Sequence, residues 1–289
     1  RDRNRWRTFP QQVSPTKLDE RLLDTFTLEG LFEELEAGAV EDWPARCIAT
    51  AFHRLGKLKH PDASQRTGEA IKRLARGLER IEPGELGPKD LGKLIYSFGV
   101  LRFRRKRLFN ALLDDAARRL GDFDPRGMAN AMYALGVLGT RHTRFLTAVA
   151  EQAPERLADF EVQEIVNTVY SMARLDFRHK EFLGAVCREV PARFGEFNAQ
   201  ELSNIIYGMW NLKFRHRFFL TEICRHLPRR LDEFNPQNLA NVLYAFGKLK
   251  FKDPEFVKAA SLHIGTRVSE LNKAKIIVNI MRSLQQLQS

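Results

Sequence analysis

Basic side chains recur at a fixed interval along the chain. Arg104, Arg141, Arg178, Arg215 and Lys252 follow one another every 37 residues. Guanidinium and ammonium groups bind phosphate, and phosphate contacts position a nucleic-acid strand without reading its sequence. We therefore interpret these five cations, called the basic rail below, as a phosphate-binding edge. The alternative interpretation is a set of solvated turns on a basic protein.

The residue after each rail position forms a second column, which consists of Arg105, His142, His179, His216 and Asp253. Histidines can bind metal, but ligands of one ion must lie within about 4 Å of each other because metal–nitrogen distances are near 2.0–2.1 Å. Equivalent residues of stacked helical units lie roughly 10 Å apart. We therefore predict no metal site and no cofactor. The arginine and the histidines are interpreted as further RNA contacts, the histidines as partial cations or stacking groups, with a plain polar turn as the alternative.

The same interval governs the elements that must position these columns. Tyrosines recur every 37 residues, each within a similar segment such as LANVLYAFGKL at 239–249. A period of this size is typical of helical solenoids, in which each unit packs only on its neighbours. The tyrosines are Tyr96, Tyr133, Tyr170, Tyr207 and Tyr244.

Each unit contains the signals of two helices. Asn235 and Pro236 show how the first helix begins, because asparagine caps a helix N-terminus and proline is favoured at its first position. Apolar residues at spacings of three and four then form one stripe, and a second stripe follows after a short basic turn. The sequence therefore predicts an all-α protein, an α-solenoid of about six stacked helix-turn-helix repeats. The two example stripes are Leu239, Leu243, Phe246 and Leu249, and Phe182, Val186, Val190 and Phe194.

Three segments follow from the limits of the repeat register. The repeats cover residues 45–289, and residues 18–44 form an N-terminal capping helix region. Residues 1–17 form a basic arm in which arginines alternate with polar residues. Such an arm is expected either to lie along RNA or to be a disordered tail, and it can be what remains beside a removed transit peptide.

Two further columns favour structural roles, one of them with an open alternative. Arginines at 119, 156, 193, 230 and 267 are each followed three residues later by a carboxylate, so we expect ion pairs that neutralise them. Asparagines at 130, 167, 204 and 241 lie three residues before a tyrosine. The asparagines either tie adjacent first helices together or face a groove and contact nucleotides, and the tyrosines either stack bases or belong to the core.

One column changes from apolar to polar along the array, from Val100 and Val137 to Arg174, Asn211 and Lys248. If an RNA sequence is read by a constant scaffold, variable side chains must read it. We therefore assign base contacts to the three polar members.

Composition limits the class of protein. The formal charge of +11 and the pI near 9.8 favour an acidic partner, for which nucleic acid is the commonest candidate. No apolar run approaches the roughly 20 residues that span a bilayer, so we expect a soluble protein without membrane insertion. The sequence contains no glycine-rich phosphate loop, no metalloprotease motif and no clustered carboxylate pair, and we expect no enzyme. Cys187 and Cys224 are expected to be packing residues.

At Phe234 to Leu249 the sequence resembles the octotricopeptide and heptatricopeptide repeat proteins, and it is similar to the repeat region of FAST-kinase-domain proteins. The resemblance covers about residues 45–289. It implies an organellar RNA-binding protein, mitochondrial or alternatively plastid, that acts on mRNA or ribosomal RNA or has a place beside other proteins in a mitochondrial ribosome. We thus expect a non-catalytic RNA-binding protein, and the alternative is a protein–protein scaffold in a large organellar complex.

Overall fold

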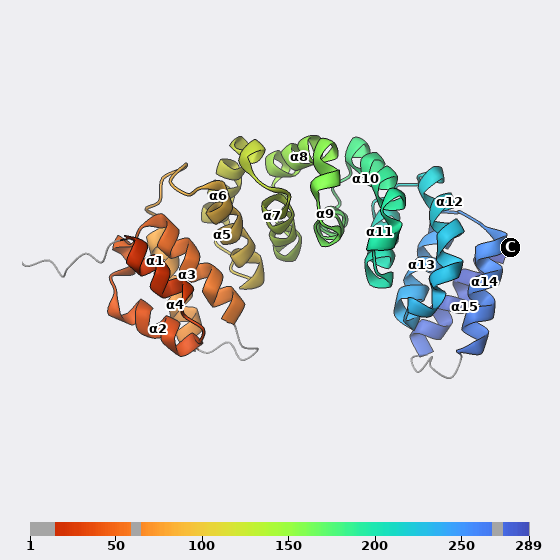
Figure 1. The fold of residues 1–289 in the computed structure, drawn as a ribbon, viewed down its shortest axis with the longest axis horizontal. Helices are drawn as coiled ribbons and strands as arrows, with labels where there is room; N and C mark the ends of the chain where they lie inside the picture. Colours follow the sequence, from red (N-terminus) through yellow and green to blue (C-terminus); the bar gives the residue numbers. More distant parts are fainter. Residues whose placement is uncertain (1–14, 59–64, 268–273, 289) are drawn as a thin grey trace, which may run out of the picture. The chain divides into compact units, whose positions relative to one another are not determined.

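The computed structural model describes residues 15–58, 65–267 and 274–288. All regular structure within these ranges is helical, which confirms the predicted all-α solenoid fold class (Figure 1). The helices are α1 (Pro15–Leu23), α2 (Leu28–Ala37), α3 (Ala45–Leu58), α4 (Gln65–Leu78), α5 (Pro88–Val100), α6 (Lys106–Arg118), α7 (Pro125–Leu138), α8 (Thr143–Gln152), α9 (Val162–Arg174), α10 (Lys180–Ala192), α11 (Ala199–Asn211), α12 (Arg217–His226), α13 (Pro236–Lys248), α14 (Pro254–Thr266) and α15 (Ala274–Gln288).

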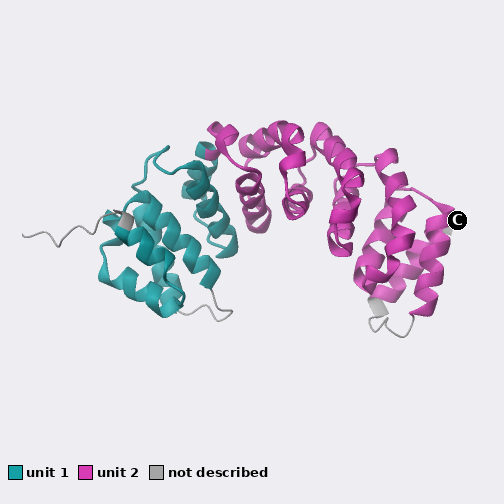
Figure 2. Ribbon diagram, viewed as in Figure 1, with its two compact units in different colours: residues 1–115 teal, residues 116–289 magenta. Residues whose placement is uncertain are grey.

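Two compact units make up the chain, residues 1–115 and residues 116–289 (Figure 2). The first contains α1 to α5 and most of α6, and the second contains α7 to α15. The division into arm, capping region and repeat array stays a prediction. Most of the expected arm lies outside the described residues, and α1 begins at Pro15.

The first helices of the repeats begin where the sequence predicts. Asp124 accepts a hydrogen bond from the Gly127 amide at 2.7 Å and Pro125 opens α7. Asn235 accepts from the Asn238 amide at 2.8 Å before α13. These caps satisfy amides that the first turn of a helix leaves without an internal partner. The predicted capping role is therefore confirmed.

In unit 2 the first helices pack directly on one another, in the order α7, α9, α11, α13 and α15. The second helices form a separate layer, in which short 3-10 segments such as Leu227–Glu233 also contact the neighbouring helices. Close approach of first helices depends on small residues, because a Cβ at Gly136 would lie 2.8 Å from the Ser171 hydroxyl oxygen. The core contains one buried phenylalanine before each of α7, α9, α11 and α13, namely Phe123, Phe160, Phe197 and Phe234.

Unit 1 has a core of the same kind. The rings of Phe52 and Phe98 stack at 5.5 Å between centroids, and Phe98 stacks on Phe109 at 5.4 Å. The buried Thr50 hydroxyl donates to Asp19 at 2.8 Å, which joins α3 to α1. Large apolar side chains thus stabilise this unit, and the buried Asp19 carboxylate is hydrogen-bonded.

The cysteines are packing residues, as expected. Cys187 and Cys224 are buried on second helices, and the Cys187 sulfur lies 4.0 Å from the Met209 sulfur on a first helix. Burial raises the pKa of the Cys187 thiol to about 12. A thiol that stays protonated at neutral pH is a weak nucleophile, so its contribution is to packing.

Candidate nucleic-acid interface

The turn between the two helices of a repeat has the same backbone conformation in each repeat from α5 to α14. One residue after each first helix adopts a left-handed conformation with φ between 48° and 65°. The amide that follows it donates back to the helix, for example from Phe214 to the Met209 carbonyl at 2.8 Å and from Phe251 to the Phe246 carbonyl at 3.1 Å. This is a Schellman motif, which closes a helix C-terminus. The left-handed residues are Arg102, Gly139, Asp176, Lys213 and Lys250.

This turn fixes the basic rail. The residue before each rail position is usually phenylalanine, which packs inward: Phe177 and Phe251 are buried, and the Phe251 ring lies 6.0 Å from that of Phe246. In the four repeats of unit 2, the residue after it caps the second helix. The rail residue is held between these two anchors, and its side chain is exposed at all five positions, Arg104, Arg141, Arg178, Arg215 and Lys252.

The rail charges are not neutralised by carboxylates. Within the described ranges, no ion pair joins a rail residue to an aspartate or glutamate. Two of them instead contact the next turn of unit 2: the Arg178 guanidinium lies 5.7 Å from the Phe214 ring centroid, and Arg215 donates to the Lys250 carbonyl at 3.2 Å. These contacts leave the positive charge available to an anion. By contrast, the predicted contact residue Arg105 forms an ion pair with Glu79.

The histidine column has a structural role that the sequence analysis did not assign. The Nδ1 atoms of His142, His179 and His216 accept the backbone amide three residues later at 3.3, 3.4 and 3.3 Å, and so cap α8, α10 and α12. Asp253 caps α14 in the same way at 2.9 Å. An Nδ1 that accepts a hydrogen bond carries no proton, so the caps require neutral rings with the proton on Nε2.

The environment of His216 favours that neutral form. Burial, and then the nearby positive charge of Arg188, hold the pKa of His216 below its usual value. A cationic ring at a helix N-terminus would also oppose the helix dipole. The interpretation of the histidines as RNA contacts stays a prediction, and any such contact from a capping ring would use Nε2.

The base-reading column lies on the first helices. Arg174, Asn211 and Lys248 are exposed at the C-terminal ends of α9, α11 and α13. Arg174 donates to the Gly136 carbonyl at 2.9 Å and to the Tyr170 hydroxyl at 3.1 Å. Each member of this column lies four residues before the rail residue of the same repeat, on the helix that leads into the turn.

The asparagine and tyrosine columns share that face. Asn167 and Asn241 are half-buried and accept hydrogen bonds from Gln163 and Gln237, respectively, both at 2.9 Å and both within one helix. These hydrogen bonds therefore do not join adjacent first helices. Tyr170 is 40% exposed.

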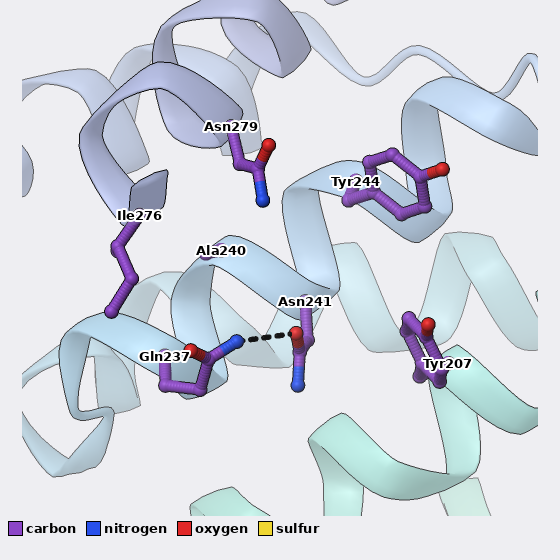
Figure 3. A pocket seen from close by; sticks show the side chains of 7 residues that line it. All are labelled: Tyr207, Gln237, Ala240, Asn241, Tyr244, Ile276 and Asn279. Atoms are coloured by element: carbon purple, nitrogen blue, oxygen red, sulfur yellow. Dashed lines mark hydrogen bonds between the residues drawn. The ribbon is translucent and has the colours of Figure 1, made fainter. Parts of the chain in front are cut away.

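An open pocket of about 400 Å³ lies on this face of unit 2, between α11, α13 and α15 (Figure 3). Gln237, Asn241 and Tyr244 line it from α13, Tyr207 from α11 and Asn279 from α15. Figure 3 shows the Asn279 amide directed toward the space above Asn241. Amide and aromatic side chains thus converge on one opening.

The arginine column is structural, as expected, and its main contacts are with backbone carbonyls. Arg230 donates to the carbonyls of Phe194 and Phe197, which lie just before α11, at 3.0 and 2.7 Å, and it pairs with Glu233 at 2.6 Å. Arg193 makes the equivalent bond to the Phe160 carbonyl at 2.9 Å. We call these contacts the arginine clamps. The carbonyl partners could not be recognised from spacing alone, because backbone atoms leave no mark in the sequence.

The family model described as RNA-editing substrate-binding complex 6 protein matches residues 94–191 and 186–287. A search of curated proteins finds no significant match. Among the described helices, none is both long and apolar enough to cross a bilayer. In the same parts of the chain, no group of three or more His, Cys, Asp or Glu side chains is arranged to hold a metal ion.

Proposed function

The chain belongs to the RNA-editing substrate-binding complex 6 protein family, and we propose that it is a non-catalytic RNA-binding subunit of a mitochondrial RNA–protein assembly. The assembly is an RNA-processing complex or the mitochondrial ribosome. The family name supports an association with RNA, and the resemblance to octotricopeptide and heptatricopeptide repeats supports the organelle.

The observation that carries the proposal is the exposed rail, whose members form no ion pair with the carboxylates that the structure describes. In unit 2, four successive repeats present Arg141, Arg178, Arg215 and Lys252 at the same position of the same turn. A row of cations at regular spacing fits a strand whose phosphates also repeat. We propose that the rail binds the RNA backbone while the adjoining first-helix face meets the bases.

Salt dependence tests this proposal. Each ionic contact with a single strand contributes roughly 0.7 to the slope of log affinity against log salt concentration. Changing the four unit 2 rail residues to glutamine should therefore make the slope shallower by about 3. The measurement is the binding of a labelled single-stranded RNA between about 50 and 300 mM salt, a range over which screening separates ionic from apolar association.

A matched control removes the same charge elsewhere. Arg188, Arg225, Arg229 and Lys258 are exposed on the second helices or the 3-10 segment that follows α12, and none belongs to the rail. Their conversion to glutamine lowers the net charge by the same four units. Equal slopes for the rail variant and this control would show that the rail does not bind phosphate.

A second candidate function is a protein scaffold. Helix α15 exposes Val278 and Met281, at 44% and 62%, and α14 exposes Leu262 at 65%. Val278 and Met281 line one opening on α15, and exposed apolar side chains of this kind favour contact with another protein. Association through them should persist at high salt, whereas RNA binding through the rail should weaken steeply.

A further inference from the structure

The pocket between α11, α13 and α15 presents a fixed pair of hydrogen-bonding groups. Gln237 Nε2 donates to Asn241 Oδ1 at 2.9 Å (Figure 3). This bond orients both amides, so that Gln237 Oε1 remains as an acceptor and Asn241 Nδ2 as a donor. Neither of these two atoms has a protein partner among the hydrogen bonds of the described residues. The two groups lie four residues apart on one helix and face the same opening.

We propose that this pocket binds one unpaired nucleobase, an inference that rests on the proposed RNA-binding function and extends it from phosphates to bases. An adjacent acceptor and donor match the edge of a base that carries a donor beside an acceptor. Single-stranded RNA offers such edges because its bases are unpaired. The rings of Tyr207 and Tyr244 line the same pocket and supply surfaces on which a base can stack.

The geometry of the amide pair occurs twice in unit 2. On α9, Gln163 Nε2 donates to Asn167 Oδ1 at the same 2.9 Å, and Tyr170 follows three residues later. On α13 the order is the same, with Tyr244 three residues after Asn241. Each tyrosine also carries a cation over its ring, Arg174 at 5.7 Å and Lys248 at 5.4 Å. Repetition of the whole group supports a binding role, because a buried packing role would not need oriented, partly exposed amides.

The pocket has a natural fluorescent reporter. The Trp210 ring lies 4.9 Å from the rings of both Tyr207 and Tyr244. Replacing Trp6 and Trp43 by phenylalanine leaves Trp210 as the single tryptophan. The experiment titrates this protein with 12-residue oligomers of A, U or C, and with an abasic sugar–phosphate oligomer of equal length. We expect the base-containing oligomers to change Trp210 fluorescence, and the abasic oligomer to bind the rail without that change.

Variants separate the pocket from the rail. Gln237→Leu combined with Asn241→Leu should weaken binding of the best homopolymer about tenfold, because two hydrogen bonds to the base are lost. The salt slope should stay the same, since no ionic contact changes. Gln152→Leu on α8 is the matched control, because it removes an exposed amide from a second helix. The control should bind as the unchanged protein does.

A second pair of variants keeps the test valid if the amide variant unfolds. Tyr244→Phe retains a stacking ring, and Tyr244→Leu removes it, so only the leucine variant should lose affinity. Equal responses of Trp210 to abasic and base-containing oligomers, or full affinity in both the amide and the leucine variants, would overturn the pocket while leaving the rail intact. If the unchanged protein binds no RNA at all, the proposed function fails together with the pocket.

Discussion

Lysines in the left-handed region predict a measurable strain in the inter-helix turns. Lys213 and Lys250 have φ values of 52° and 53°, where a side chain with a Cβ costs about 1–2 kcal/mol per residue relative to a right-handed conformation. Glycine avoids this cost but loses roughly 0.5–1 kcal/mol more in backbone entropy on folding. Lys213→Gly should therefore raise the free energy of unfolding by up to about 1 kcal/mol, and the double variant by up to about 2 kcal/mol.

Thermal unfolding followed by circular dichroism measures this effect. For a chain of 150–250 residues, 1 kcal/mol corresponds to about 2–4 °C in melting temperature. The reverse substitution can be made at Gly139, which occupies the same turn position with φ of 65°. Gly139→Lys should therefore lower the melting temperature by a similar amount. Gly195→Lys is the matched control, because Gly195 has no positive φ and a Cβ there would meet nothing within 4 Å.

The same variants connect stability to binding. Lys213 lies two residues before the rail residue Arg215, so its removal should weaken RNA binding while the protein becomes more stable. A lysine that costs stability at such a position is typical of a functional site. The reasoning is refuted if Lys213→Gly lowers the melting temperature, or if Gly139→Lys leaves it unchanged.

Two further predictions concern a helix cap and a clamp. Burial and Arg188 lower the pKa of His216 in the folded protein. The His216 cap therefore contributes fully to stability above the unfolded pKa near 6.5, and this contribution is lost as the pH falls from there toward the folded pKa. His216→Asp copies Asp253, so its melting temperature should fall less than that of the unchanged protein as the pH is lowered from 7 to about 5.5. An identical pH profile in both proteins would contradict the capping role. Arg230→Met should destabilise by about 2–3 kcal/mol, measured by urea unfolding, because two carbonyls lose a charged donor, while RNA affinity stays unchanged. The neighbouring Arg229→Met is its control, and equal stability of the two variants would show that the clamp contributes nothing.

Much of the fold could be predicted because its signals are local and repeated. Asn235 and Pro236 mark a helix start by their own chemistry, and the stripe from Leu239 to Leu249 is buried as its spacing predicts. The left-handed turn was missed because only Gly139 carries the usual signal for it. Three of its four equivalents, Arg102, Lys213 and Lys250, rarely adopt this conformation, and only Asp176 is of a type that does so more often. Single-residue propensity therefore conceals the motif.

The candidate site was less accessible to sequence analysis. The rail was identified from charge and period, and its exposure follows from the turn that holds it. The capping role of the histidines was not anticipated, because histidine is a less usual cap than Asp253 in the same column. The pocket beside Tyr207 and Tyr244 could not be predicted either, since it is formed by three helices that are distant in sequence.

The arginine clamps give the repeat array an evolutionary freedom. Each clamp joins positions 33 residues apart in the sequence, as between Phe197 and Arg230 or Phe160 and Arg193. This separation is four residues shorter than the 37-residue period, so each clamp returns to the segment just before the first helix of the arginine's own helix pair. If one whole period were lost by deletion or gained by duplication, each of Arg156, Arg193, Arg230 and Arg267 that remained would still lie 33 residues after a phenylalanine carbonyl. The number of repeats can thus change during evolution without the loss of a clamp hydrogen bond at the junction. The length of RNA strand that the rail can follow changes with it.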